Sequence, residues 1–264
     1  MNNEETTVVE QIQRMIVALV ATSPAGQGLC LIGGFRYRFL DGGVRRSMDV
    51  DYHWGDDLIE KQTQLVQLFR RRLIPDVKRR LRYEGSASPA QGPDSDSTSV
   101  KVVDLAFWRQ GGELGRIELP VDVRRIVCLD EPVIRTRDGV VYRTASNTDM
   151  IEAKILALFS RTLMEHRDLV DIFLFANHLA ADSTKRIRKK LAMLHVKAGV
   201  VQERLADLVK HRAYHVKAIE DVVSSQLDPE AAINIQTAGG GAAVLNALLG
   251  TLKDRLELDK GQEQ

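Results

Sequence analysis

The sequence predicts an α+β protein, with a small mixed β-sheet core flanked by helices over residues 1–146 and a C-terminal helical bundle over residues 147–264. Up to residue 146, short apolar runs typical of strands alternate with helical patterns and glycine-rich turns. After residue 146 the apolar residues recur at helical spacing, and no further strand pattern follows. The change of pattern is therefore the predicted domain boundary. Because ligand sites often lie between domains, we expect the second region to complete the functional site of the first.

The first part of the chain alternates helices and short strands. In chain order, we expect a helix over 6–22, a strand over 30–32, a short helix over 35–40, a second strand over 50–54 and a long helix over about 57–81. Asp56 and Asp57 have the residue type that caps a helix N-terminus. Pro75 lacks a backbone N–H and should kink or break the long helix.

The next part reads as strands and turns. Residues 84–98 are small, polar and rich in turn formers, which predicts a flexible loop at the mouth of the site. The elements expected after it are strands over 100–108 and 114–123 joined by a hairpin turn at 110–112, then one or two strands within 126–145 with a turn at Asp138-Gly139.

Helical periodicity dominates the rest of the chain. The expected helices are 148–162, 165–180, 183–196, 200–224 and about 228–259. Three consecutive glycines at 239–241 interrupt the last of these and favour a break there.

Composition sets limits on the class of protein. Hydrophobic residues make up 44% of the chain and charged residues 28%, which is ordinary for a globular protein. The net charge of +1 favours no overall attraction to nucleic acid, so a basic surface must be local. The two cysteines, Cys30 and Cys128, are expected to be buried thiols in a reducing compartment. The polar, acidic N-terminus is unlike a signal peptide, and no apolar run reaches transmembrane length, so we expect a cytoplasmic protein without membrane contact.

Asp49 and Asp51 are the strongest candidates for chemistry. Alternate residues of a strand point to the same face, so the two carboxylates should project side by side while Val50 faces the core. Carboxylates this close repel each other unless a positive group neutralises them. Mg²⁺ is a natural partner because it prefers carboxylate oxygens and leaves positions open for phosphate. The alternative interpretation is a pair of ordinary exposed acids on a strand.

A glycine pair, Gly33-Gly34, precedes the short helix and offers bare backbone N–H groups to phosphate. The string Leu-Ile-Gly-Gly, followed by Arg-Arg-Ser47-Met-Asp49-Val-Asp51, resembles the motif of the DNA polymerase beta superfamily of nucleotidyltransferases. More narrowly, it is similar to the AbiEii group of nucleotidyltransferase toxins, which includes the MenT-type toxins. The resemblance implies a nucleotidyltransferase core in which Gly33, Gly34 and Ser47 cradle phosphate oxygens.

The third carboxylate of such a site should come from a neighbouring strand. Glu118, flanked by Ile117 and Leu119, looks like the apolar-acid-apolar strand of the family and is the candidate metal ligand beside Asp49 and Asp51. Two other acids, Asp104 and Asp122, are the alternatives. Glu118 is equally compatible with an acid on the solvent face of a half-buried strand.

A second resemblance lies in the helical region. Lys154 stands in an otherwise apolar stretch, where an ammonium group is costly unless it meets an anion. This helix and the Arg-Asp-x-x-Asp segment that contains Asp168 and Asp171 resemble two helices of the AbiEii group. By resemblance, Lys154 binds nucleotide phosphates, Arg161 on nearly the same face extends the cationic strip, and Asp168 or Asp171 orients Lys154 or acts as a base. Alternatively, Lys154 forms an ion pair with either acid that only joins two helices.

The resemblance implies a Mg²⁺-dependent reaction, with Mn²⁺ as a substitute, that moves a nucleoside monophosphate from a nucleoside triphosphate to an acceptor. By family precedent the acceptor is the tRNA 3′ end, and the protein is the toxin of a bacterial toxin–antitoxin pair with a cognate antitoxin protein. Three alternatives stay open. These are transfer to a protein side chain, transfer to a small molecule as in aminoglycoside nucleotidyltransferases, and a binding module that grips nucleotide or a partner without turnover.

Two basic segments are candidates for the phosphate contacts that tRNA requires. One is the C-terminal half of the long helix, residues 70–82, which is equally compatible with a solvated face that complements the helix C-terminus. The other comprises Lys185, Arg186, Arg188, Lys189 and Lys190. His211 and His215 lie one helical turn apart, as two zinc ligands can, but the sequence marks no third ligand, and we expect both at the surface.

Overall fold

The computed structural model describes residues 3–91, 99–109 and 115–256, and the side chains from residue 7 onward. The chain forms two compact units. Unit 1 comprises residues 1–43, 47–126 and 132–145, and unit 2 comprises residues 44–46, 127–131 and 146–264. Each unit has its own hydrophobic core.

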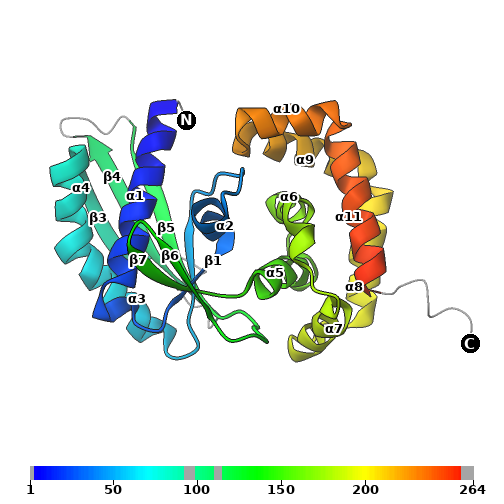
Figure 1. Cartoon of the computed structure of the whole chain (residues 1–264), viewed down its shortest axis with the longest axis horizontal. Coiled ribbons are helices and arrows are strands. Elements are labelled where there is room, and N and C mark those ends of the chain that lie inside the picture. Colours follow the sequence, from blue (N-terminus) through cyan, green and yellow to red (C-terminus); the bar gives the residue numbers. More distant parts are fainter. Residues whose placement is uncertain (1–2, 92–98, 110–114, 257–264) are drawn as a thin grey trace, which may run out of the picture. The chain divides into compact units, whose positions relative to one another are not determined.

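Unit 1 is a seven-stranded mixed sheet with helices packed on it (Figure 1). The strand order is β3-β4-β5-β2-β1-β7-β6, in which β2 runs parallel to β5 and β1 parallel to β7, while all other neighbours are antiparallel. The strands are β1 (Cys30–Ile32), β2 (Val50–His53), β3 (Tyr83–Pro89), β4 (Val100–Arg109), β5 (Ile117–Arg124), β6 (Val133–Arg137) and β7 (Val140–Thr144). The helices are α1 (Asn3–Ala21), η1 (Pro24–Gly26), α2 (Gly33–Asp41), α3 (Leu58–Leu68), η2 (Phe69–Leu73) and α4 (Ile74–Leu81).

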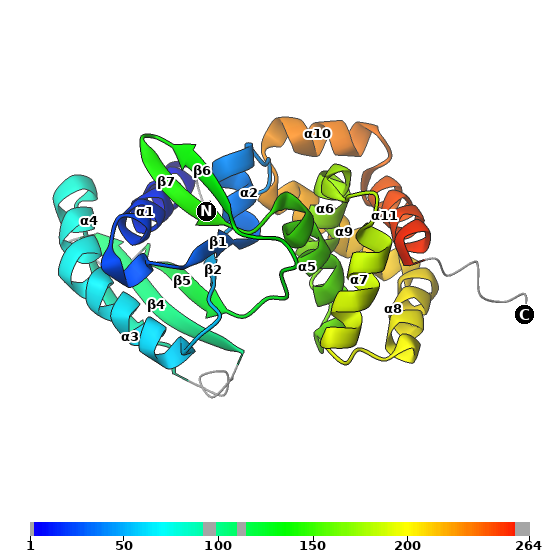
Figure 2. The same ribbon diagram turned by 60° about the horizontal axis from the view of Figure 1, so that its bottom comes forward.

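Unit 2 is helical throughout its described residues apart from its connecting segments (Figure 2). Its helices are α5 (Asn147–Ser160), α6 (His166–Phe175), η4 (Ala176–His178), α7 (Ser183–Met193), α8 (Ala198–Lys210), α9 (Arg212–Gln226), α10 (Pro229–Thr237) and α11 (Gly240–Leu256). The predicted helix 200–224 is broken at His211, and the last predicted helix is broken at Gly239, which has a φ of +110°. The α+β class, with a mixed sheet followed by a helical bundle, is confirmed.

The prediction of a loop over residues 84–98 is wrong for its first part, because Tyr83–Pro89 forms β3 and pairs with β4. Gly85 lies so close to the ring of Phe107 that a Cβ there would stand 2.7 Å from it. The small side chain that suggested a turn therefore serves close packing between two strands. Residues 92–98, and the hairpin turn predicted at 110–112, lie outside the described residues. The turn at Asp138-Gly139 between β6 and β7 is confirmed, and both residues have positive φ, at 51° and 75°.

Pro75 changes the helix before it rather than ending it. The backbone N–H of Ile74 bonds to the carbonyl of Phe69, five residues back, so that residues 69–73 form one π-helical turn between α3 and α4. A proline cannot donate the N–H that would continue the α-helical ladder, which explains the wide turn at this position. Phe69 and Leu73 are buried at its two ends.

Two further observations concern the environment of the chain. Cys30 is buried as expected, whereas Cys128 is only half-buried. Across residues 3–91, 99–109 and 115–256, each helix is too short or too polar to cross a membrane.

Candidate active site

Two carboxylates of unit 1 lie on the neighbouring strands β2 and β5, and a third, Asp49, directly precedes β2. The register sets Asp51 directly opposite Asp122. Val50 and Val121 precede them and are completely buried in the core, so the pleat turns both acids to the other face of the sheet. Asp49 stands two residues before Asp51, and by the same alternation it belongs to that face.

Asp122 therefore replaces Glu118 as the candidate for the third carboxylate. Glu118 pairs in register with Ala106 of β4, and its side chain is 75% exposed and 3.5 Å from Arg116. Four residues of strand separate it from Asp122, which corresponds to roughly 13 Å. The alternative interpretation of Glu118, an acid on the solvent face of a half-buried strand, agrees with this geometry. Asp104 also faces away from the core on β4 and lies opposite Pro120.

Arg124 bridges two of these acids. Its Nη2 atom lies 3.0 Å from Asp51 Oδ1 and also donates to Asp122 Oδ2. Burial by itself lowers the pKa of the Arg124 guanidinium, but the negative charges of Asp51, Asp122 and Asp49 outweigh burial and raise its pKa above the ordinary value. The three acids thus create a position that favours a cation. The sequence analysis missed Arg124, although the Asp-Val-Arg spacing already puts it on the same strand face as Asp122.

Gly33 is required by the carboxylate beside it. Its φ is +79°, and a Cβ at this residue would stand 2.0 Å from Asp51 Oδ2. Only glycine combines this backbone conformation with such a close approach. Gly33 and Gly34 open α2, and the preceding residue, Ile32, has no side-chain acceptor to cap the first N–H groups. Backbone donors at the start of α2 thus lie next to the acids of β2.

Ser47 is held beside Asp49. Its hydroxyl donates to Asp49 Oδ1, and its carbonyl accepts a bond of 2.7 Å from Gln13 Nε2. Both Ser47 and Gln13 are buried. The structure therefore gives Ser47 a positioning contact with a carboxylate, beside the phosphate contact that the resemblance implies.

The donor set fits a hard divalent cation. Carboxylate oxygens are the ligands that Mg²⁺ and Mn²⁺ prefer. Among the described residues, no three His, Cys, Asp or Glu side chains are already arranged around a metal position, and the Arg124 guanidinium bridges two of the three acids. A cation at Asp51 and Asp122 would compete with Arg124 for the same oxygens. The missing Cβ of Gly33 is what allows the Asp51 carboxylate to lie against the start of α2.

Unit 2 brings together the four predicted residues of the second motif. Lys154 Nζ lies 2.6 Å from Asp168 Oδ1 and 3.0 Å from Asp171 Oδ2. Arg161 Nη1 lies 2.7 Å from the other oxygen of Asp168. Burial lowers the pKa of Lys154, but Asp168 and Asp171 outweigh burial and raise it above its ordinary value, so Lys154 is charged.

A fifth residue, Arg45, completes this cluster and was missed by the sequence analysis. It forms a two-pronged ion pair with Asp171, at 2.5 Å from Nε and 2.8 Å from Nη2, and both side chains are buried. Burial raises the pKa of Asp171, whereas Lys154 and Arg45 together hold it below the usual value. Three cations, Lys154, Arg161 and Arg45, thus contact the two carboxylates of Asp168 and Asp171. No local pattern links Arg45 to Asp171, because α6 lies far along the chain.

The basic segment after residue 183 is not uniformly a surface for phosphate. Lys190 is completely buried, with Nζ 2.6 Å from Asp149 and 2.7 Å from Glu152, which are also completely buried. Arg186 bonds to both of these acids and to Asp130. These two cations therefore hold α5, α7 and residues 127–131 together, and the prediction that they contact tRNA is wrong. The other members, Lys185, Arg188 and Lys189, are exposed.

His215 is buried rather than at the surface. Its Nδ1 lies 2.9 Å from Nε2 of His166, and its Nε2 lies 3.1 Å from Asp207. Burial and the neighbouring His215 both lower the pKa of His166. Only His211 is exposed as expected. The three groups form a hydrogen-bonded chain that joins α6, α8 and α9.

Comparison with solved structures identifies proteins of the same fold. A candidate nucleotidyltransferase from H. pylori aligns over 100% of both chains with a TM-score of 0.57 and 17% identity. JHP933 from Helicobacter pylori aligns over 97% of this chain and 94% of its own, with a TM-score of 0.53 and 16% identity. MenT4, a nucleotidyltransferase toxin from Mycobacterium tuberculosis, aligns over 96% of this chain and 82% of its own, with a TM-score of 0.53 and 15% identity. No protein-family model and no curated protein sequence matches the chain. The chain therefore has the fold of these structures, two of which are described as nucleotidyltransferases.

Proposed function

We propose that this protein is a Mg²⁺-dependent nucleotidyltransferase that moves a nucleoside monophosphate from a nucleoside triphosphate to the tRNA 3′ end and releases pyrophosphate. We further propose that it acts in the cytoplasm as the toxin of a bacterial toxin–antitoxin pair. The observation that carries the proposal is the group Asp49, Asp51 and Asp122 against the Gly33 turn, within a fold shared with nucleotidyltransferase structures. The toxin role is supported by the description of one of these structures as a toxin and by the motif resemblance.

In this proposal Asp51 and Asp122 hold the divalent cation, with Asp49 beside them. When bound, the cation would neutralise triphosphate charge and lower the pKa of the acceptor hydroxyl. Gly33 and Gly34 donate backbone N–H groups to phosphate oxygens. Ser47 keeps the Asp49 carboxylate in place through its hydrogen bond.

Lys154 supplies positive charge to the nucleotide phosphates. Each carboxylate that contacts Lys154 also has a guanidinium partner, so a triphosphate that draws on the ammonium group would leave neither acid without a cation. Asp168 and Asp171 orient the ammonium group, and Arg45 fixes Asp171. Arg161, which is one-third exposed, can turn a guanidinium N–H toward phosphate while Lys154 still pairs with Asp168.

The proposed reaction is tested by incubating the purified protein with total tRNA, Mg²⁺ and each nucleoside triphosphate labelled at the α-phosphate in turn. Label should enter tRNA with at least one nucleotide, and Asp49→Asn should abolish it. Asp122→Asn should reduce labelling about 100-fold or more, while the matched Glu118→Gln should leave it within about twofold. Equal effects of these two substitutions would refute the assignment of the third carboxylate.

Other results would redirect the proposal. Label on protein bands would indicate a side-chain acceptor, and label on neither class of macromolecule, with nucleotide still bound, would favour a small-molecule acceptor or a binding module. Induced expression in a bacterial host tests the toxin role separately, because growth arrest that requires Asp49 is expected of a toxin. A cognate antitoxin would be identified as the protein whose coexpression restores growth.

A further inference from the structure

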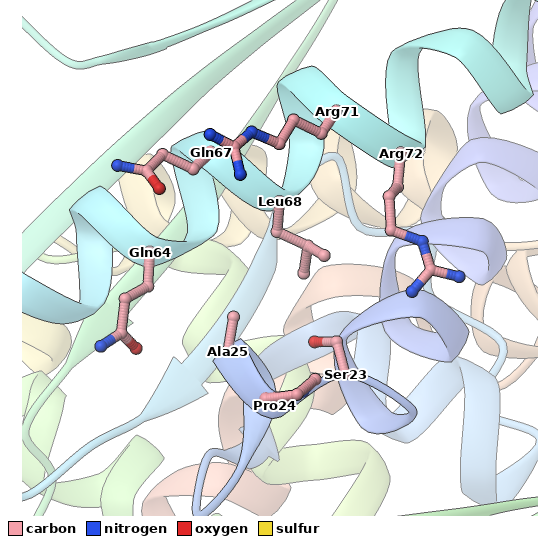
Figure 3. A pocket seen from close by; sticks show the side chains of 8 residues that line it. All are labelled: Ser23, Pro24, Ala25, Gln64, Gln67, Leu68, Arg71 and Arg72. Carbon is pink, nitrogen blue, oxygen red and sulfur yellow. The ribbon is translucent and has the colours of Figure 1, made fainter.

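Unit 1 contains a pocket that the proposed reaction does not use. Its volume is about 440 Å³, and it lies between the turn that contains η1 and the helical stretch formed by α3 and the π-helical turn (Figure 3). Arg71 and Arg72 approach it from the helical side together with Gln64 and Gln67, while Ser23 lies on the opposite wall. None of the residues that line it is acidic.

The two arginines carry positive charge that the described residues do not neutralise. Arg71 and Arg72 are exposed, and neither is within ion-pair distance of a carboxylate among the described residues. Four other cations of this basic segment, Arg70, Lys78, Arg79 and Arg80, each have a hydrogen-bond or ion-pair partner. Arg79 and Arg80 share Asp76, and Lys78 pairs with Glu84, whereas Arg70 donates its Nε–H to the carbonyl of Ala87.

The π-helical turn presents this pair in a defined way. Phe69 and Leu73 are buried on either side of the arginines, and Ile74 closes the turn on Phe69. The wide turn is enforced by Pro75, so it is part of the folded structure and not a fluctuation. Such turns inside α-helices are frequent at functional sites. The guanidinium groups therefore start from a fixed segment of backbone, which reduces the entropy that a ligand must overcome.

The donors form a row rather than a ring. Gln64, Gln67 and Arg71 are spaced as i, i+3 and i+7, so they follow one face of the helix over roughly 10 Å. Gln64 Nε2 donates one N–H to Glu60 Oε1 at 2.9 Å, which leaves its second amide N–H for a ligand. Leu68 lies beside this row and supplies an apolar surface within the pocket (Figure 3). A row of amide and guanidinium donors matches a strand that repeats one anionic group per nucleotide, and guanidinium groups bind phosphate through paired hydrogen bonds. An isolated carboxylate would satisfy only one end of the row.

We propose that this pocket binds consecutive phosphodiester groups of an RNA strand, so that the acceptor is held at a point apart from the carboxylates of β2 and β5. The inference rests on the proposed function, because the pocket has a role in the reaction only if the acceptor is an RNA. The binding itself is independent of nucleotidyl transfer and can be measured without it.

The test measures the affinity of the full chain for total tRNA by filter binding over a range of salt concentrations. All proteins carry Asp49→Asn, so that no transfer accompanies binding. The pocket variant combines Arg71→Gln and Arg72→Gln. The matched control combines Arg79→Gln and Arg80→Gln, which removes the same charge from exposed positions on the same helical stretch. All four side chains are exposed, so folding should be preserved, and thermal unfolding checks this.

The pocket variant should bind tRNA roughly tenfold more weakly, and the slope of log affinity against log salt should become shallower by about 1 to 2, as expected for the loss of two phosphate contacts. The control should stay within about twofold of the parent protein. Equal losses in both variants, no loss in either, or no tRNA binding by the parent protein would each overturn the proposal. Unchanged tRNA affinity with weakened binding of a polyglutamate peptide would also overturn it, and would assign the pocket to an acidic protein segment.

The two proposals fail in different ways. If the unmodified protein, which retains Asp49, labels no tRNA but the binding results are as expected, the proposed reaction is refuted and the proposed RNA-binding pocket is supported. If it labels tRNA and the pocket variant retains full affinity, only the pocket is refuted.

Discussion

Lys154 allows a role in the reaction to be tested separately from a role in stability, because both acids that contact it have a second cationic partner. Two carboxylates, Asp168 and Asp171, contact its ammonium group, but each also has a guanidinium partner of its own, Arg161 and Arg45 respectively. In Lys154→Met, two guanidinium groups would still face two carboxylates. The buried acids would lose a hydrogen bond but would keep a neutralising cation, so we expect a loss of about 1–2 kcal/mol in the free energy of unfolding.

Lys190→Met is the comparison for Lys154→Met, because the acids around Lys190 do not each have a second cation of their own. Lys190 contacts Asp149 and Glu152, which are completely buried. The other cation in contact with these acids among the described residues is Arg186, which must also neutralise Asp130. Lys190→Met would leave one guanidinium for all three acids. The cost of an uncompensated buried charge is about 3–5 kcal/mol, so this substitution should destabilise the protein at least twice as much as Lys154→Met.

The assay combines thermal unfolding with the nucleotide transfer reaction. For a chain of this size, 1 kcal/mol corresponds to a shift of roughly 2–4 °C in Tm, so a decrease of about 10 °C or more is expected for Lys190→Met and of only a few degrees for Lys154→Met. The exposed neighbour offers a matched control for stability, and Lys189→Met should leave Tm unchanged. Lys154→Met should reduce transfer about 100- to 1000-fold, because it removes the charge that faces the phosphates.

Two results would refute this reasoning. A decrease in Tm for Lys154→Met as large as that for Lys190→Met would mean that Lys154 is mainly an ion pair that joins α5 to α6. Transfer activity close to that of the unmodified protein would show that its charge is not used in the reaction.

Three further predictions follow from single contacts. Gly33→Ala should abolish transfer and lower Tm by several degrees, because its Cβ would overlap Asp51 Oδ2. The control is Gly42→Ala, where φ is +68° but nothing lies within 4 Å, and this substitution should lower Tm without reducing transfer. Equal losses of activity in the two variants would contradict the prediction. Arg124→Gln should increase the rise in Tm that Mg²⁺ produces, since the guanidinium no longer competes for the carboxylates, and an unchanged Mg²⁺ response would argue against competition. Burial and the neighbouring His215 lower the pKa of His166 in the folded state, although the charges of Glu165 and Asp207 oppose them. This histidine therefore contributes stability above pH about 6.5 that is lost as the pH falls. Tm measured from pH 7.5 to 5 should therefore decrease less in His166→Asn than in the unmodified protein, and parallel curves would contradict the assignment.

The predictions from sequence that depend on local geometry agree with the structure. The turn at Asp138-Gly139 is specified by residues that tolerate positive φ, and the structure has a hairpin there. The pairing of Asp49 with Asp51 follows from the alternation of a single strand, and the buried Val50 between them agrees with it. Pro75 interrupts the ladder of hydrogen bonds in its own helix, although the sequence did not indicate that a π-helical turn would absorb the change.

The contacts of the candidate site that the sequence did not indicate depend on packing between distant segments. Glu118 and Asp122 lie on the same face of one strand, and only the register between β2 and β5 puts Asp122 beside Asp51. The contrast between Lys190 and the exposed Lys189 depends on which face of α7 meets α5, and both are equally basic in the sequence.

By itself, the sequence determined the fold class, the acidic strand with its glycine turn, and the basic and acidic residues of the second motif, because spacing along a strand or a helix fixes which side chains share a face. The tertiary structure alone decided the partners of those residues. Arg45 joins Asp171, Arg124 joins Asp51, and Arg71 and Arg72 keep their charge without a carboxylate among the described residues. Each of these outcomes depends on packing between elements far apart in the chain, and the free energy of a charge depends on what lies within a few ångströms of it.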